Sequence, residues 1–410
     1  MSFSTVSRDS ATASLGSAFA DRRVRIPTLK VGIDATCITT VPEEGKDQVI
    51  YNLLRGLHEL GHGRQVTVFG YSFLEERLRH MLPDGDVRVF QRWRRGKKLV
   101  QDLPLRTFVL PRCARRAGLD IMLFPKTQTG FGVFAMPTVV IPHDIQCRAF
   151  PERFSKSMLA LKRTFYAVDF RLRDRIVAVS DFDAQEIRHY YPRQADKIVR
   201  LYNPIHFAAH EAAGDHPPHP RPYLVSVNHR YPHKNAMTLL RAFDALRDRI
   251  PHDLVLVGKV HPASQPLVEF VQQRGLGHRV TFTGYVEERH LQRLIRGADL
   301  YVNPSLYEGF GMAPVEAMGM GTPVLSTRDA ALQETTRGLA QYYEPSRDPQ
   351  ALAHKLLDVL AYPPSVADRR RIQEAVRGSY DYRVIAAEYW KLFAALAVER
   401  GERERAVASA

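Results

Sequence analysis

The sequence predicts an α/β protein built from two doubly wound domains, each a parallel sheet covered by helices. Short β-branched runs alternate with amphipathic helical segments along the chain, and this alternation is typical of such sheets. The alternation stops once, at a proline-rich stretch, and then starts again. With 410 residues, 45% of them hydrophobic, the chain is too long for one ordinary core and can bury two.

Residues 1–28 are rich in Ser, Thr and Ala and lack the apolar core of a signal peptide. We therefore expect a disordered tail there, and no export by that route. The sequence also has no run of about 18 apolar residues that could span a bilayer. These observations predict a cytoplasmic protein.

The first domain is predicted at residues 29–206. It contains seven short runs with the composition of strands, separated by segments with the apolar spacing of helices. These strand candidates are KVGID at 30–34, VTVFG at 66–70, VRVF at 87–90, IMLF at 121–124, TVVIPHD at 138–144, IVAVS at 176–180 and IVRLYN at 198–203.

Residues 207–222 hold four prolines and no apolar period, so we expect a linker. The second domain is predicted at 223–380. After it, residues 381–398 carry apolar residues at helical spacing, which predicts a helix that packs back across the domains and leaves 399–410 as a tail. The strand candidates of the second domain are YLVSV, LVLVG, VTFTG, DLYVNPS and PVLST.

Charge and cysteine content limit the classes of function. A formal net charge of +14 and a pI near 9.7 predict anionic partners: nucleic acid, a phosphorylated small molecule or lipid headgroups. The three cysteines, Cys37, Cys113 and Cys147, are odd in number and far apart. This pattern fits a reducing compartment and argues against a disulfide scaffold or a zinc site.

In doubly wound sheets, ligands bind outside the carboxyl ends of the strands, where helix N-termini favour phosphate. The loop NHRYPHKN follows the strand YLVSV and places Arg230 four positions before Lys234. A planar guanidinium and a compact ammonium at this edge would suit a diphosphate. The alternative is a pair of solvated surface cations.

A second loop, within DLYVNPSLYEGFGMAPVEAM, carries Glu308, Gly309 and Gly311, and Pro314 marks the expected start of a helix with Glu316 in its first turn. Glycines let the backbone approach a ligand closely, and ionised carboxylates accept hydrogen bonds from hydroxyls. The alternative is that Glu316 only complements the helix dipole and Glu308 is an exposed loop charge.

The stretch YEGFGMAPVEAMGMGTPV resembles the donor-site signature of the family 4 glycosyltransferases, in which two glutamates are separated by seven residues. The resemblance covers roughly residues 30–395 and implies the GT-B fold, two Rossmann-like domains facing a cleft. It also implies transfer of a sugar from a nucleotide diphosphate donor to an acceptor hydroxyl, with retention at the anomeric carbon. Other segments that carry it are YLVSVNHRYPHKN, VTFTGYVEERHLQRLIRGADLYVNPS, VVIPHDIQCRAFPERFS and RIVAVSDFDAQEI.

The resemblance assigns roles to the donor residues. It implies that Glu316 accepts hydrogen bonds from the ribose hydroxyls and that Glu308 holds hydroxyls of the donor sugar. The backbone N–H groups of Phe310, Gly311 and Met312 would help to orient sugar and phosphate. Arg230 and Lys234 would neutralise the departing diphosphate and so bind the transition state more tightly than the ground state.

His143 and Asp144 end the strand candidate TVVIPHD, which points at the same cleft. A lone histidine is more often a packed polar residue, but the resemblance implies that His143 lies near the anomeric centre and hydrogen-bonds the sugar. It is not expected to be a nucleophile. Retaining chemistry in this family is generally explained by front-face attack, in which a donor phosphate oxygen takes the acceptor's proton.

Two loops depart from the family pattern. The loop after the first strand has only Gly45 where the family has a glycine pair or triplet, although Gly45 and the following helix N-terminus can still face phosphate. Glu43 and Glu44 in that loop are alternatives for acceptor recognition. Asn203-Pro204 replaces the expected Asn-Gly after the last strand of the first domain.

We expect no cofactor and no metal, because no Asp-x-Asp motif lies in a convincing loop and the basic pair already serves the diphosphate. NHRYPHKN resembles family members that transfer mannose, which leads us to GDP-mannose as the donor. Basic and aromatic residues are interleaved at 92–98 and 161–175. These segments suit an anionic inner membrane face and a saccharide or lipid-linked saccharide acceptor of cell-surface polysaccharide synthesis, unless they form a solvated loop and helix.

Three alternatives remain open at this point. A nucleotide-sugar 2-epimerase has two such domains and would release an epimerised or free sugar instead of a glycoside. A nucleic-acid-binding protein would explain the charge, but no nucleic-acid module is recognisable and the basic residues form no stripe. A non-catalytic scaffold is disfavoured because both glutamates and the basic pair are present.

Overall fold

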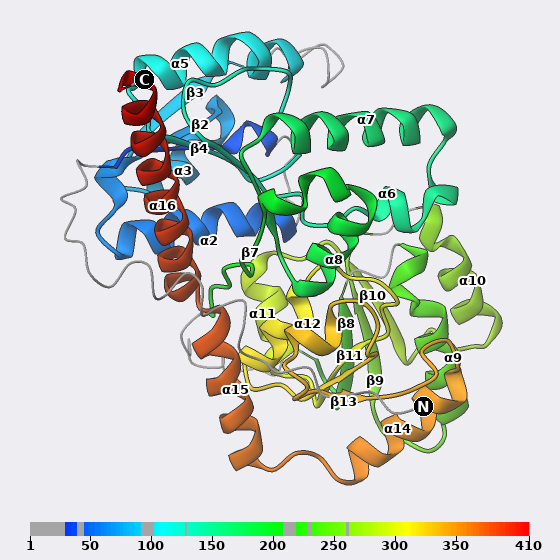
Figure 1. Ribbon diagram of the computed structural model, residues 1–410. Coiled ribbons are helices and arrows are strands. Elements are labelled where there is room, and N and C mark those ends of the chain that lie inside the picture. Colours follow the sequence, from blue (N-terminus) through cyan, green and yellow to red (C-terminus); the bar gives the residue numbers. More distant parts are fainter. Residues whose placement is uncertain are drawn as a thin grey trace, which may run out of the picture.

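The computed structural model describes residues 29–38, 45–91, 102–127, 129–207, 219–227, 231–259 and 262–409. Within them the chain forms two parallel sheets, one in each half of the sequence, with helices on both faces of each sheet (Figure 1). Every pair of neighbouring strands in both sheets runs parallel. The architecture is that of two Rossmann-like domains.

The first sheet has seven strands in the order β3-β2-β1-β4-β5-β6-β7. The reversal of order next to β1 is the switch point at which such sheets bind ligands. β5 and β7 are shorter than their predicted runs: Pro142 follows β5 and has no N–H to donate, and β7 stops before Asn203-Pro204. The strands are β1 (Val31–Asp34), β2 (Val66–Tyr71), β3 (Asp86–Phe90), β4 (Ile121–Phe124), β5 (Thr138–Val140), β6 (Arg175–Ala178) and β7 (Ile198–Arg200).

The second sheet has six strands in the order β10-β9-β8-β11-β12-β13. Five of them coincide with predicted runs, and the sixth, β13, is a two-residue edge strand that no run predicted. The strands are β8 (Tyr223–Val227), β9 (Asp253–Val257), β10 (Val280–Gly284), β11 (Leu300–Asn303), β12 (Val324–Ser326) and β13 (Gln341–Tyr342).

Several helices begin at a residue whose side chain caps the first turn. Ser180, Asp348 and Asp381 each accept a hydrogen bond from a backbone N–H two or three residues later, which satisfies a donor that the helix leaves free. The helices of the first domain are α2 (Gly45–Glu59), α3 (Glu75–Met81), α5 (Leu110–Arg116), α6 (Gln146–Ala149), α7 (Lys156–Leu172) and α8 (Asp181–Tyr190). Those of the rest of the chain are α9 (Ala236–Leu246), α10 (Gln265–Gln273), α11 (Glu288–Arg296), α12 (Met312–Gly319), α13 (Leu332–Thr335), α14 (Pro349–Ala361), α15 (Val366–Tyr380) and α16 (Tyr382–Ala408).

The chain returns to the first domain through its last two helices. α15 lies against α12 of the second domain, and α16 runs along α2 of the first (Figure 1). Gly56 of α2 makes this contact close: a Cβ there would stand 2.6 Å from the Tyr382 carbonyl oxygen. The predicted tail at 399–410 is wrong, because α16 continues to Ala408 and Glu399 pairs with Arg175 of β6 at 2.8 Å.

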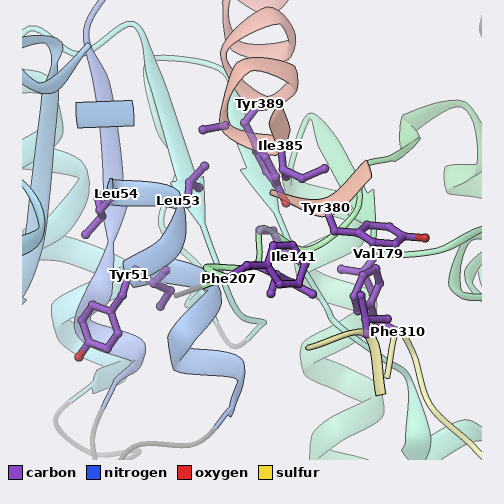
Figure 2. Close-up of a cluster of buried hydrophobic side chains, with 14 of the residues drawn as sticks. Tyr51, Leu53, Leu54, Ile141, Val179, Phe207, Phe310, Tyr380, Ile385 and Tyr389 are labelled. Carbon is purple, nitrogen blue, oxygen red and sulfur yellow. The ribbon is translucent and has the colours of Figure 1, made fainter. Parts of the chain in front are cut away.

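One hydrophobic core extends through both domains. Figure 2 shows part of it, with α2 on one side and the loop of the second domain that carries Phe310 on the other. The ring of Phe310 stands perpendicular to that of Tyr380, with 5.4 Å between centroids, and its centroid is 6.0 Å from that of Tyr202. Such aromatic pairs contribute about 1 kcal/mol each beyond their burial, so the domains are held together by packing as well as by the chain.

Candidate active site

The loops that carry the predicted site residues lie at the carboxyl ends of their strands and meet between the domains. β5 leads to His143, and β11 leads to Glu308 and Gly309. A Cβ on Gly309 would stand 2.1 Å from the carbonyl oxygen of His143, which no real side chain tolerates. The Ser180 hydroxyl also donates to the Gly309 carbonyl oxygen at 2.7 Å. Only glycine permits this approach of the two backbones.

A carboxylate of the second domain binds the N-terminus of α8 in the first. Glu334 accepts the backbone N–H groups of Asp181 at 2.7 Å and Phe182 at 3.1 Å. A carboxylate at a helix N-terminus satisfies free donors and complements the helix dipole. This contact fixes the two domains relative to each other beside the Gly309 loop.

His143 is buried and has a left-handed backbone, with φ at 65°. Its Nε2 lies 2.8 Å from the carbonyl oxygen of Pro125, and because a carbonyl only accepts, Nε2 carries the proton and Nδ1 is the acceptor nitrogen. Burial, and then the nearby Lys46 and Lys126, lower the pKa of His143 to about 3. The imidazole is therefore neutral at pH 7 and is a weak base.

Two lysines flank this histidine, each paired with a carboxylate. Lys46 Nζ lies 2.6 Å from Asp144 Oδ2, and Lys126 Nζ lies 2.5 Å from Asp47 Oδ1. Burial alone would raise the pKa of Asp144, but Lys46 outweighs it and the pKa is lowered. Lys126 was missed in the sequence, where its only signal is its position two residues after the end of β4.

Lys234 and Glu308 form an ion pair in the second domain, with Nζ 2.6 Å from Oε1 and each side chain 14% exposed. Lys234 ends the short 3-10 turn Pro232–Lys234 after β8, and Glu308 follows β11. The two predicted donor residues therefore lie together at neighbouring strands of the sheet.

His233, next to Lys234, is a second buried histidine that the sequence analysis did not single out. Its Nδ1 lies 2.6 Å from Arg153 Nη1 of the first domain, and because a guanidinium only donates, Nδ1 accepts. Burial, then Lys234 and Arg153, lower the pKa of His233 to about 3. Arg153 thus adds a further cation of the first domain to the Lys234 side of the site.

Glu316 lies further into its helix than predicted. α12 begins at Met312, two residues before Pro314, because Gly311 takes a left-handed conformation with φ at 81° and serves as the N-cap. Glu316 is consequently in the second turn, half-buried. Burial and the neighbouring Glu288 raise its pKa to about 8. Tyr301 of β11 interacts electrostatically with both Glu308 and Glu316, so both glutamates lie near this strand.

The remaining predicted residues have simpler surroundings. Phe310 is buried in the interdomain core, so only its backbone can face a ligand, and Met312 begins α12. Gly45 is the exposed first residue of α2, and a Cβ there would meet nothing within 4 Å. Arg230, Glu43, Glu44 and the basic segment 92–98 lie outside the described residues.

The second basic segment differs from its prediction in one respect. Within 161–175, the aromatic rings of Phe165, Tyr166 and Phe170 are buried in the first domain, so they cannot dock on a surface. The exposed residues of this segment include the apolar Leu161 and Leu172 and the cationic Arg171.

No group of three or more His, Cys, Asp and Glu side chains is arranged to hold a metal ion in the part of the chain that the structure describes. None of the helices described above combines the length and the apolar character needed to cross a bilayer.

Comparison with known families shows to which family the chain belongs. The family model described as Glycosyltransferase Family 4 matches residues 45–209, and the model described as Glycosyl transferases group 1 matches residues 211–378. The chain belongs to the family 4 glycosyltransferases. The resemblance inferred from the signature at 307–324 is confirmed, and so is the GT-B fold of two Rossmann-like domains.

Curated relatives of this family member match parts of it. A D-inositol 3-phosphate glycosyltransferase of Mycolicibacterium gilvum is 30% identical over 52% of this chain and 50% of that protein. The serotype-specific mannosyltransferase WbdA of Escherichia coli is 28% identical over 42% of this chain and 23% of that protein. The O-antigen chain mannosyltransferase B of Escherichia coli is 27% identical over 53% of this chain and 60% of that protein. The chain therefore matches less than two thirds of the length of each relative.

Solved structures share the fold over nearly the whole chain. The sucrose-phosphate synthase of Thermosynechococcus elongatus has a TM-score of 0.72 at 19% identity and covers 90% of this chain and 100% of its own. The Anabaena protein HepE, solved in complex with UDP-glucose, has a TM-score of 0.68 at 17% identity and covers 90% of this chain and 100% of its own. At these identities the likeness establishes the fold.

Proposed function

We propose that this family member is a retaining glycosyltransferase that moves a hexose from a nucleotide diphosphate sugar to a hydroxyl of a saccharide or lipid-linked saccharide. The observation that carries the proposal is the ion pair of Lys234 with Glu308, at 2.6 Å, because Glu308 precedes Gly309, which contacts the backbone of His143 of the other domain. A cation suited to a diphosphate, a carboxylate suited to sugar hydroxyls and a neutral imidazole therefore lie together.

In this proposal, cations stabilise the departing diphosphate. Negative charge grows on the diphosphate as the sugar departs, and Lys46, Lys126 and Lys234 are all near the interface, each held by a carboxylate. Because these charges are already positioned, they stabilise the transition state without reorganisation, at about 3 kcal/mol for one such group. We assign the same role to Arg230.

The neutral His143 fits a hydrogen-bonding role. With its Nε2–H donated to Pro125, the remaining Nδ1 can accept a hydrogen bond from a sugar hydroxyl. With a pKa of about 3, His143 is too weak a base to take the acceptor's proton at pH 7. We therefore propose that the acceptor's proton passes to a phosphate oxygen of the donor and that no enzyme base is needed.

We propose that the reaction needs no divalent cation and no cofactor. Diphosphate chemistry requires positive charge, and Mg²⁺ is one source of it. Here Lys46, Lys126, Lys234 and Arg153 supply cations from both domains. Transfer is expected to continue in excess EDTA at the rate seen with added Mg²⁺.

For the donor we propose GDP-mannose. Two curated relatives are named mannosyltransferases, and the loop NHRYPHKN resembles that of mannose-transferring members. HepE was solved in complex with UDP-glucose, which is the reason to test uridine nucleotides beside guanosine nucleotides. The acceptor class fits the same relatives, since one of them is named for the O-antigen chain.

We propose that transfer takes place at the cytoplasmic face of a membrane, on an acceptor of cell-surface polysaccharide synthesis. The net charge of +14 favours an anionic surface. On α7, Met158, Leu161 and Leu172 expose between 39% and 47% of their surface beside cationic residues. Exposed apolar groups next to cations are the combination that binds interfaces.

The experiment that tests the proposal follows the label of GDP-[¹⁴C]mannose in the presence of a bacterial lipid extract. Transfer predicts label in an organic-phase glycolipid whose anomeric configuration is that of the donor. Label found only in an epimerised sugar nucleotide or free sugar would assign the protein to the epimerase alternative. A Lys234→Ala variant serves as the inactive control, and UDP-[¹⁴C]glucose serves as the donor control.

A further inference from the structure

A cavity of about 300 Å³ lies in the first domain, away from the candidate active site. Its lining includes residues at the amino ends of β5 and β6, whereas His143 lies past the carboxyl end of β5. The other wall is the last part of α16. The cavity therefore occupies the opposite edge of the sheet from the donor residues, and it is as large as the smaller ligand pockets of proteins.

Four arginines line this cavity. Arg173 is the C-cap residue of α7, Arg175 begins β6, and Arg400 and Arg403 come from α16. Two carboxylates, Asp174 and Glu399, also line it. Positive charge is therefore in excess on the cavity wall.

Both carboxylates are engaged with other groups. Asp174 accepts hydrogen bonds from the backbone N–H and the hydroxyl of Thr138, both at 2.8 Å. Glu399 binds Arg175 at 2.8 Å and lies 4.0 Å from Arg403, whose side chain is 76% exposed. Arg400 pairs with Glu404, 2.6 Å away. Glu399 and Glu404 thus hold Arg175 and Arg400 in position, and donors of Arg173 and Arg403 remain for another partner.

Arg173 is the unusual member of the group, because it is 1% exposed. Its Nη2 donates to the carbonyl oxygens of Gly130 and Gly132, and its guanidinium lies 5.0 Å from the ring centroid of Phe124. Its Nε has no hydrogen-bond partner, and Asp169 and Asp174 act on the guanidinium only electrostatically. Burial still lowers the pKa of Arg173 despite these two carboxylates, so an anion in the cavity would offset part of the cost of burying this cation.

We infer that this cavity binds a phosphate-bearing anion between the first sheet and α16. Guanidinium groups match the paired oxygens of phosphate, and they bind it by charge-assisted hydrogen bonds. A phosphate monoester or diester with a small organic group fits the volume. Because two of the arginines come from the junction of α7 and β6 and two from the end of α16, the bound anion ties that helix end to the first domain.

The phosphate can come from a soluble ester or from a lipid headgroup. Val133 and Leu172 also line the cavity and are 82% and 40% exposed, so apolar groups surround its mouth. A soluble ester uses only the cavity, whereas a headgroup also brings acyl chains against these exposed side chains. Two arms of one experiment separate the two sources.

The first arm is calorimetric titration of the full-length protein with inorganic phosphate and with sn-glycerol 3-phosphate. The second is flotation with vesicles of phosphatidylglycerol or of phosphatidylcholine. The test variant is Arg400→Gln/Arg403→Gln, which removes two cations of α16 and leaves the buried Arg173 in place so that the fold is preserved. Lys391→Gln/Arg371→Gln removes the same charge elsewhere, from side chains 72% and 70% exposed.

We expect the test variant to weaken binding of at least one probe about tenfold while the control variant binds like the wild type. Loss in the titration assigns a soluble ester, and loss in flotation on phosphatidylglycerol alone assigns a headgroup. A Lys234→Gln variant separates this site from the donor site, because it should weaken nucleotide binding and leave the cavity unaffected. The inference is overturned if neither probe binds, or if both double variants weaken binding equally.

Discussion

The backbones of His143 and Gly309 are in direct contact between the two domains. A Cβ on Gly309 would stand 2.1 Å from the His143 carbonyl oxygen. The obstacle would be a backbone atom, so it cannot rotate aside as a side chain does. The spacing between the loop that carries Glu308 and Gly309 and the His143 backbone therefore depends on the absence of one methyl group at Gly309.

The first prediction follows from this contact. Gly309→Ala should push the two loops apart and lower the transfer rate about 100-fold, because a displacement near 1 Å is enough to lose reactive geometry. Gly277→Ala is the matched control, since a Cβ at Gly277 would meet nothing within 4 Å and its φ is not positive. Equal rates for the two variants, measured as kcat, would show that the contact does not set the reactive geometry.

The second prediction concerns the Lys234–Glu308 pair. Removing the ammonium by Lys234→Ala should lower kcat about 100-fold, corresponding to ~3 kcal/mol of electrostatic stabilisation. Because the two groups are 2.6 Å apart, a double-mutant cycle with Glu308→Ala should be non-additive. Lys391→Ala, which removes an exposed lysine of α16, should leave kcat unchanged. Additive effects in the cycle would contradict a shared role.

The third prediction is that His143 does not titrate near neutral pH. With a pKa of about 3, lowered by burial and the adjacent lysines, its imidazole stays neutral at all pH values above about 5. Its carbon-bound ring proton signals in NMR should therefore keep one chemical shift from pH 5.5 to 8.5, while exposed histidines move. A titration of the His143 signal near pH 6.5 would exclude the neutral imidazole.

The fourth prediction is a pH dependence of stability from Glu316. Its pKa is about 8 in the folded protein, against the usual 4.5, because of burial and Glu288. Between these two values the folded state holds a proton that the unfolded state has lost, so stability must fall as pH rises through this window. Glu316→Gln removes this contribution to the pH dependence of stability. The free energy of unfolding in urea should fall more between pH 5 and pH 8 for the wild type than for the variant. An equal fall in both proteins would refute the raised pKa.

Much of the fold could be predicted because buried parallel strands read as β-branched runs. Such a run is visible for every strand except β13, which has only two residues and takes its place from its neighbour β12. The end of α16 could not be predicted from apolar spacing, because residues 399–408 are mostly charged. That helix end is held to the first domain by Arg175, which is far away in the sequence.

The candidate site was predictable only in part. The two glutamates and the glycines belong to one recognisable signature. Lys234 follows the strand β8, which is the neighbour of β11, so its proximity to Glu308 follows from the topology. The contact of Arg153 with His233 joins residues 80 positions apart on two domains, and no pattern in either segment indicates it. The raised pKa of Glu316 depends on burial and then on Glu288, and both arise only in the folded chain.

Selective binding of one nucleotide tests the central claim most directly. We would measure the thermal shift of the purified protein with UDP, GDP, ADP and their sugar conjugates, beside Glu316→Ala and Lys234→Ala variants. The donor-site account predicts a shift with one base, GDP by our proposal, that is lost in both variants. The absence of a shift with any nucleotide at millimolar concentration, or an equal shift in the variants, would contradict it.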